Sequence, residues 1–494
     1  MPGRQTGGPG ADKGGDMQEQ AGARIGRRAF LSAGLILLVL MIAAGILTRV
    51  VPAGTYDRVI QDGHEVLDPA SFRFTQGAPL PVWRWFTAPI EVLWSSDAVT
   101  VITIILFILL VGGSFAVLDQ AGVVRTLIAA IVTRFRTRRY VLIAVTCLFF
   151  MALGALLGLF EETVPLIPIV VALAWSMGWD SLTGLGMSLL STGFGFSAAI
   201  ANPFSIGVAQ GIAGLPLFSG AGFRAMVFVV IYGIVASFVI HHARRVERGG
   251  VPAWPEEKAA RARYSQSAGA AQSATPRRAI LWAACCLGAM LVIVVLGPLV
   301  PALRTYSLPL IGLAFVAAGI GSGLLAGMGV RRTLRTLASG VAGMAPGVIL
   351  ILMAMSVKLI VSEAGIMDTI LHTAASGIAR TSPSIASLLL YGVTLGMNFL
   401  IGSASAKAFL MMPLLAPLAD LVGLTRQVAV TAFCFGDGFS NLIYPTNAVL
   451  LIGLSLTSVS YPRWFRWTIL LQLLVLAVTV AFLLLAVSIP LGPF

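Results

Sequence analysis

Charged residues are scarce in this chain of 494 residues, and cysteine and histidine are scarcer still. Asp, Glu, Lys and Arg make up 11% of the sequence against 57% hydrophobic residues, and there are four cysteines and four histidines. Several uninterrupted apolar runs reach the roughly 20 residues that a helix needs to cross a bilayer. A soluble class is therefore excluded, and we expect an all-α polytopic membrane protein.

Catalytic and nucleotide-binding motifs are also missing. The sequence contains no Walker A loop, zinc motif or nucleophile elbow, so direct ATP coupling and hydrolase chemistry have no support. One adjacent histidine pair, His241-His242, ends an apolar run, which gives a membrane-bound enzyme no catalytic constellation. The cysteines all lie in apolar spans without metal-ligand spacing and are interpreted as small core residues: Cys147, Cys285, Cys286 and Cys434. We expect no enzyme activity, resident cofactor or metal.

The formal net charge of +13 does not indicate nucleic-acid binding, because the basic residues cluster in short loops between apolar runs. This is how cytoplasmic loops look under the positive-inside rule. The distribution predicts a multi-pass protein of the bacterial inner membrane. Residues 1–28 are predicted to be a disordered cytoplasmic tail, and the C-terminus is predicted to lie outside.

A repeated motif organises the rest of the chain. Residues 193–200 and 436–443 share the pattern G-x-G-F-S-x-x-I, and Asn202-Pro203 or Pro445-Thr446-Asn447 follows with a small slip. Glycine and proline weaken a helix at membrane depth, and freed backbone groups are tolerated there only against protein or a cavity. Two interrupted helices at matching places in two halves indicate the binding site of a secondary transporter.

Two further apolar stretches are too interrupted to be ordinary spans. Residues 140–178 contain Glu161, Glu162 and several Gly and Pro residues, and they form either two full spans or one re-entrant hairpin. Each half has only about 15–18 apolar residues, and charged residues at membrane depth usually line a protein interior, so the hairpin is favoured. A second hairpin is predicted at 384–422.

Together these features predict two inverted repeats, each with four spanning helices and a re-entrant hairpin, joined by a linker helix. The first repeat covers 29–242, with hairpin 140–178 and broken helix 182–208. Residues 243–307 form a cytoplasmic linker and the linker helix. The second repeat covers 308–494, with hairpin 384–422 and broken helix 427–453.

The two hairpin ends offer opposite charges. Glu161 and Glu162 could bind an ammonium or guanidinium group or couple protons or sodium, or they could cap the following half-helix, as Thr163 could. Ser403, Ser405 and Lys407 suit a substrate carboxylate, although Lys407 could instead snorkel to the outer surface. An acidic end facing a basic end suits an amino acid.

The broken helices supply oxygen ligands beside unwound backbone. Predicted substrate-binding residues are Ser197, Asn202 and Asn447, and predicted ion-coupling residues are Asp437, Ser440, Asn441 and Thr446. Asp437 could hold sodium, carry a proton or pair with a neighbouring donor. Lys358, Glu363, Asp368 and His372 are predicted to be interfacial.

These motifs carry a resemblance to a known family. The runs Gly158–Pro165, Gly193–Pro203, Gly402–Lys407 and Ser440–Asn447 resemble the C4-dicarboxylate anaerobic carrier family, and within it the YfcC-like branch labelled as basic amino-acid antiporters. The resemblance extends from about Ala29 to the C-terminus. It implies the ion transporter superfamily fold, with a scaffold that forms a homodimer and a mobile domain carrying two opposed hairpins.

The function expected is secondary active transport, by symport or antiport, of a small amino acid or carboxylate. Glu161 and Glu162 favour a basic amino acid, whereas Lys407 and the family name favour a C4-dicarboxylate. A channel is the alternative of another class, although polarity is concentrated at mid-depth sites. Sodium or a proton is the expected coupling ion, and the partners expected are the substrate and the lipid bilayer.

Overall fold

The computed structural model describes residues 27–61, 64–68, 70–75, 80–135, 137–270, 275–296, 307–489 and 491–492. Most of the predicted tail, and the linker residues 271–274 and 297–306, lie outside these ranges. Within them, nine helical segments are long and apolar enough to cross a bilayer: Ala33–Val50, Val101–Gln120, Arg139–Leu157, Ser181–Ile212, Ala221–Glu247, Val330–Glu363, Pro383–Leu400, Ala404–Leu421 and Tyr461–Ser488. The expectation of a helical multi-pass membrane protein is confirmed.

The first half of the chain runs from α1 to α10. Its helices are α1 (Arg27–Val50), α2 (Val82–Glu91), η1 (Val92–Trp94), α3 (Ala98–Gln120), α4 (Val123–Phe135), α5 (Arg139–Ala152), η2 (Leu153–Leu157), η3 (Glu161–Leu166), α6 (Ile167–Ser176), α7 (Ser181–Leu185), η4 (Gly186–Leu190), α8 (Ser191–Ala198), η5 (Pro203–Gly207), α9 (Val208–Ile212) and α10 (Ala221–Glu247). Here η2, η4 and η5 are π-helical turns, and η1 and η3 are 3₁₀ turns.

The second half follows α11 (Pro255–Ala270) and α12 (Arg277–Leu296). Its helices are α14 (Ser307–Leu325), α15 (Val330–Gly343), α16 (Ala345–Glu363), α17 (Met367–Ile378), α18 (Pro383–Leu400), α19 (Ala404–Leu421), α20 (Arg426–Gly438), η6 (Phe439–Leu442), α21 (Ala448–Ser455) and α22 (Tyr461–Ser488). The order of elements matches the first half from α1 to α10: a span, two further helices, a short helix, a hairpin, an interrupted helix and a long final helix.

Short strands depart from the all-α expectation. β1 (Gly54–Thr55) pairs with β4 (Arg73–Phe74), and β2 (Arg58–Gln61) pairs with β3 (His64–Leu67), both antiparallel. They form in the polar loop after α1, where the chain is not confined to a helix by the bilayer. The loop is fixed to the second half, because the Asp368 carboxylate accepts hydrogen bonds from the Tyr56 amide (3.0 Å) and the Arg58 guanidinium (3.1 Å).

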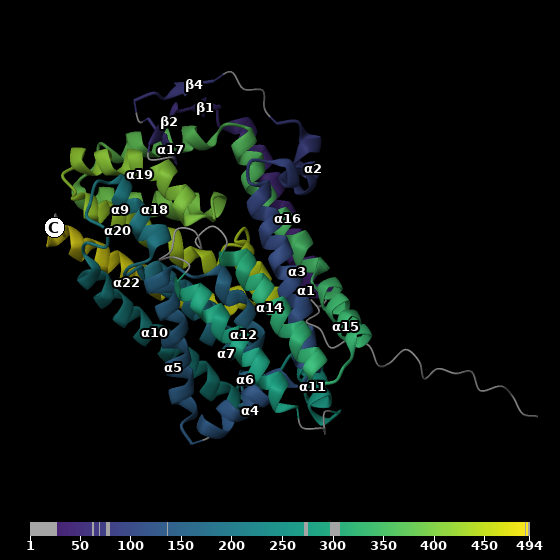
Figure 1. Cartoon of the computed structure of the whole chain (residues 1–494). Helices are drawn as coiled ribbons and strands as arrows, with labels where there is room; N and C mark the ends of the chain where they lie inside the picture. The colour runs from purple at the N-terminus through teal and green to yellow at the C-terminus, as the bar shows by residue number, and fades with distance from the viewer. Residues whose placement is uncertain are drawn as a thin grey trace, which may run out of the picture.

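The helices form two packed groups. In one, α3 packs on α14 and α15, α12 on α14, and α1 and α2 on α16; in the other, α5 and α10 pack around α8, and α18, α19 and α8 around α20. Figure 1 shows the first group to the right, with α4 and α5 low in the view and α17–α19 high in it. The two hairpins therefore lie toward opposite ends of the molecule.

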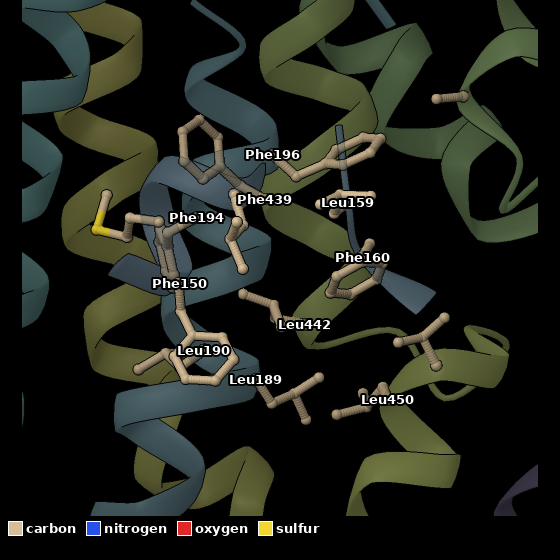
Figure 2. Packing of buried hydrophobic residues seen from close by; sticks show 14 of the residues in the cluster. Phe150, Leu159, Phe160, Leu189, Leu190, Phe194, Phe196, Phe439, Leu442 and Leu450 are labelled. Atoms are coloured by element: carbon tan, nitrogen blue, oxygen red, sulfur yellow. The ribbon is translucent and has the colours of Figure 1, made fainter. Parts of the chain in front are cut away.

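Both interrupted helices are broken, and they contact each other at the repeated motif. Ala199, after α8, has a left-handed backbone (φ 44°), and the second helix loosens into η6 before Asn447 begins α21. Figure 2 shows side chains of the first motif (Phe194, Phe196) and of the second (Phe439, Leu442) in one cluster, and the Phe194 and Phe439 ring centroids lie 5.5 Å apart. Segments that are far apart in sequence thus share one buried core.

Glycine also allows α8 to pack closely on α5, the first helix of the first hairpin. A Cβ on Gly195 would lie 2.0 Å from the Met151 carbonyl oxygen, so α8 packs directly on the backbone of the first hairpin. Small residues allow such close contact between membrane helices.

Helix α11, in the predicted cytoplasmic linker, is anchored by a buried carboxylate. Glu257 is fully buried and accepts hydrogen bonds from the Ser181 amide (3.1 Å), the Ser181 hydroxyl (2.5 Å), the Ser458 hydroxyl (2.8 Å) and the Trp175 indole (3.0 Å). One side chain therefore ties the linker to the start of the first broken helix and to the loop before α22.

Candidate functional site

A cavity of about 340 Å³ lies where the two hairpin turns meet the break of the second interrupted helix. The first hairpin contributes Glu161 and Glu162, the second contributes residues 402–406, and the break contributes Asn441, Thr446 and Asn447. Gly158 and Phe160 of the first hairpin turn also line the cavity. The remaining lining residues come from before α3 and from α3, α8, η5, α16, α18 and α21: Asp97, Ile104, Phe196, Phe204, Ala354, Met355, Lys358, Leu400, Ala448 and Val449.

The first hairpin turn is shaped by Gly158. This residue has φ 68°, and a Cβ there would lie 2.2 Å from the Asn202 side-chain oxygen, so a larger residue would collide with the break of the first helix. The Ala201 amide also donates to the Ala155 carbonyl at 3.0 Å. The hairpin turn and the first break are therefore joined through both backbone and side chain.

The acidic end of the first hairpin caps the following turn and also lines the cavity. The Glu162 carboxylate accepts a hydrogen bond from the Phe160 amide at 3.2 Å, and the Thr163 hydroxyl donates to the Phe160 carbonyl at 2.8 Å. Glu161 and Glu162 nevertheless line the cavity. Capping fixes the turn without removing the carboxylates from the cavity.

The second hairpin turn presents the start of a helix. Ser403 is the N-cap of α19, and its hydroxyl accepts a hydrogen bond from the Ala406 amide at 3.4 Å. Ser403, Ser405 and Ala406 line the cavity. A helix N-terminus carries a partial positive charge and unpaired amides, so this side suits an anionic group.

Lys407 is not among the cavity-lining residues, contrary to the role we predicted for it. It lies one turn inside α19, is fully buried, and places its Nζ 2.5 Å from Asp437 Oδ1; it also donates to the Asn398 side chain. The ammonium does not reach the outer surface, because the helix face that carries it points at α18 and α20. Asp437 accordingly pairs with a neighbouring donor.

The asparagines after the two breaks have equivalent capping roles. Asn202 accepts hydrogen bonds from the Phe204 amide (2.9 Å) and the Ser205 amide (3.3 Å), and Asn447 accepts one from the Leu450 amide (3.1 Å). Each therefore restarts its helix. Asn447 lines the cavity, whereas Asn202 does not.

The serines of the repeated motif lie in the core. The Ser197 hydroxyl donates to the Gly193 carbonyl at 2.8 Å, and the Ser440 hydroxyl donates to the Gly436 carbonyl at 3.2 Å. Neither lines the cavity, and a Cβ on Gly438 would lie 2.2 Å from Ser197 Oγ. The structure therefore gives Ser197 a packing position between the two broken helices.

Comparison with known proteins places this arrangement in a family. The model of the C4-dicarboxylate anaerobic carrier family matches residues 31–488. The chain belongs to this carrier family. It is 32% identical to the Escherichia coli (strain K12) protein named "Putative basic amino acid antiporter YfcC" over 469 residues, 87% of this chain and 91% of that protein. It is 23% identical over 370 residues to an uncharacterized protein of Haemophilus influenzae, covering 74% and 72% of the two chains.

Two solved structures give weaker matches to the carrier. Both are transporters at 17% identity and a TM-score of 0.41: MtrF of Neisseria gonorrhoeae, described as illuminating a class of antimetabolite efflux pumps, and YdaH of Alcanivorax borkumensis, described as having an unusual topology. They cover 94% of this chain, and 97% and 100% of their own lengths. Family membership makes this carrier a secondary transporter rather than an enzyme.

Two polar residues of the carrier were missed by sequence reasoning. Asn398 lies near the end of α18 and donates to Ser440 Oγ (2.7 Å) and to Asn441 Oδ1 (2.9 Å). Arg224 is fully buried in α10 and donates to the carbonyls of the break and of the following loop. The available signal was a lone polar residue in an apolar run, which usually faces a protein interior.

The ion pair between Lys358 and Asp97, unlike that between Lys407 and Asp437, lies at the cavity. Lys358 Nζ lies 2.6 Å from Asp97 Oδ2, and both residues line the cavity, a position that we did not predict for them. Asp97 and Lys358 are 261 positions apart in sequence, and no pattern links them.

Proposed function

We propose that this carrier transports a basic amino acid across the bacterial inner membrane, by exchange or in step with a coupling ion. The supporting observation is the charge of the cavity. Asp97, Glu161 and Glu162 contribute three carboxylates and Lys358 contributes one ammonium, which gives a net charge of −2 when all four are ionised. Such a lining attracts a molecule that carries more positive than negative charge.

The arrangement of these charges suits the substrate. A basic amino acid has two cationic groups and one carboxylate. The carboxylates of Glu161 and Glu162 serve the cations, while Lys358 and the amides at the start of α19 serve the carboxylate. The cavity of about 340 Å³ is of small-molecule size. The name of the YfcC relative supports the same substrate class.

The transport cycle proposed is alternating access by two inverted repeats. It is supported by the matching order of elements in the two halves and by the opposite placement of the two hairpins in Figure 1. The division into two helix groups fits a scaffold and a moving domain, and we propose an elevator-like motion in a homodimer with a cytoplasmic N-terminus and an outer C-terminus. Both halves line the proposed site, since Phe196 and Phe204 flank the first break and Thr446 and Asn447 belong to the second.

A C4-dicarboxylate is the second candidate, favoured by the name of the family. It would meet three carboxylates, those of Asp97, Glu161 and Glu162, and the single ammonium of Lys358, so the lining repels a second negative charge. A channel would instead need a continuous polar path through the spans.

Counterflow in proteoliposomes tests the proposal. Vesicles loaded with unlabelled arginine or lysine are expected to take up labelled basic amino acid faster than empty vesicles, and succinate loading is expected to have no effect. Glu162→Gln is expected to abolish uptake, whereas Asp420→Asn, at the exposed end of α19, is expected to leave it unchanged. Uptake driven by succinate alone would reverse the substrate assignment, and uptake without trans-stimulation would favour a channel.

A further inference from the structure

Lys407 and Asp437 form an ion pair sealed inside the carrier. The side chains are 0% and 1% exposed, and the Nζ lies 2.5 Å from Asp437 Oδ1. Removing two charges from water is costly unless each has a partner with good geometry. The pair joins α19 to α20 immediately before the second helix breaks.

This pair is connected to the cavity. The Asn447 side-chain amide donates to Asn441 Oδ1 at 2.9 Å, and the Asn398 side-chain amide donates to the same oxygen at 2.9 Å. Asn398 in turn accepts from Lys407. Because Asn441 and Asn447 line the cavity, a continuous hydrogen-bonded path runs from the proposed substrate site to the ammonium.

Two side-chain oxygens, Asp437 Oδ1 and Asn398 Oδ1, contact the ammonium, and the Asn398 nitrogen donates to Ser440 and Asn441 in the 3₁₀ turn η6. Broken transporter helices hold a coupling cation at such a place, where a half-helix ends and its backbone unwinds. Asp437 Oδ2 is buried without a hydrogen-bond partner, so Lys407 does not use the full binding capacity of the carboxylate.

We propose that the Lys407 ammonium is a tethered cation that takes the place of a coupling Na⁺ at Asp437, so that the carrier works without sodium. The side chain provides the positive charge that the oxygen groups require, and it cannot leave. This deepens the proposed function, since it concerns coupling at the same site, but cation binding can be measured without a transported substrate.

Thermal unfolding of the purified carrier tests the proposal. Tm is measured while NaCl progressively replaces choline chloride, so that the ionic strength stays constant. The wild type is expected to show no Na⁺-specific rise in Tm. Lys407→Ala empties the position and is expected to gain a saturable rise of about 2 °C or more in NaCl, because a ligand that binds only the folded state stabilises it. Lys407→Ala with Asp437→Asn is expected to lose that rise.

Two results would overturn the proposal. One is a saturable Na⁺-specific stabilisation of the wild type that Asp437→Asn removes, which would mean that sodium binds beside Lys407. The other is a folded Lys407→Ala protein that does not respond to Na⁺. If Lys407→Ala does not fold, radioactive Na⁺ binding to the wild type decides: no binding supports the tethered cation, and Asp437-dependent binding refutes it. A failure of basic amino-acid counterflow would leave these results unaffected, so the two proposals fail separately.

Discussion

Replacing Arg224 should destabilise the first broken helix more than any loss of surface charge would. The guanidinium donates to four carbonyls, those of Ala199 (2.8 Å), Ile200 (3.0 Å), Phe218 (3.1 Å) and Ser219 (2.7 Å). The first two belong to the break itself, where no helix supplies partners. A buried carbonyl without a donor costs free energy, and it finds no water in the bilayer core.

The size of the effect follows from counting donors. The shorter side chain of Arg224→Gln has two N–H donors, and the Ser219 carbonyl also accepts hydrogen bonds from Gln210 and Gln427. At least one of the other three carbonyls therefore loses its partner. At about 1–3 kcal/mol for each unsatisfied buried group, the variant should lose at least about 1–3 kcal/mol of stability. That is a large part of the usual margin of a folded protein, and we also expect low yield.

Thermal unfolding of detergent-purified protein measures this loss. Arg380→Gln is the matched control, because this arginine is exposed at the end of α17 and the same chemical change should leave Tm near the wild-type value. An Arg224→Gln protein that melts with the wild type would refute the reasoning, since it would mean that the break does not need a side chain to satisfy its carbonyls.

Two further predictions concern packing and selectivity. Gly195→Ala should lower Tm and the yield of monodisperse protein, since its Cβ would lie 2.0 Å from the Met151 carbonyl oxygen. Gly233→Ala is the control and should fold normally, because a Cβ there would have nothing within 4 Å. Equal Tm values for the two variants would contradict the close contact at Gly195. Lys358→Met should weaken inhibition of uptake by a basic amino acid about 10-fold to 100-fold while leaving inhibition by the corresponding diamine unchanged. An equal loss for both compounds would show that Lys358 does not distinguish the carboxylate.

The interruptions of the helices could be predicted from the sequence because their cause is local. Glycine and proline act on the backbone where they stand, and the repetition of the motif at 193–200 and 436–443 identified the equivalent positions. The acidic end of the first hairpin could also be predicted, because Glu161 and Glu162 lie in an apolar run, where a charged residue usually faces the protein interior.

The partners of the buried charges could not be predicted, because they depend on which helix face meets which neighbour. Lys407 follows Ser403 by one turn, and the sequence does not say whether that face points toward the cavity or toward Asp437. Arg224 lies in the first turn of α10, close to one end of the span, where the side chain of an arginine ordinarily extends to the membrane surface. The pairing of Asp97 with Lys358 arises from tertiary packing alone.

The docking of α11 limits how the carrier can change shape. Glu257 holds Ser181 and Ser458 at once, so while α11 stays docked the entry to one broken helix and the approach to the final helix keep a fixed separation. For the proposed cycle we therefore place the hinge elsewhere, along the contact of α21 with α16 and of α22 with α1. A crosslink between these helices should stop transport. Cleavage of the chain between α11 and α12 should leave the two fragments associated.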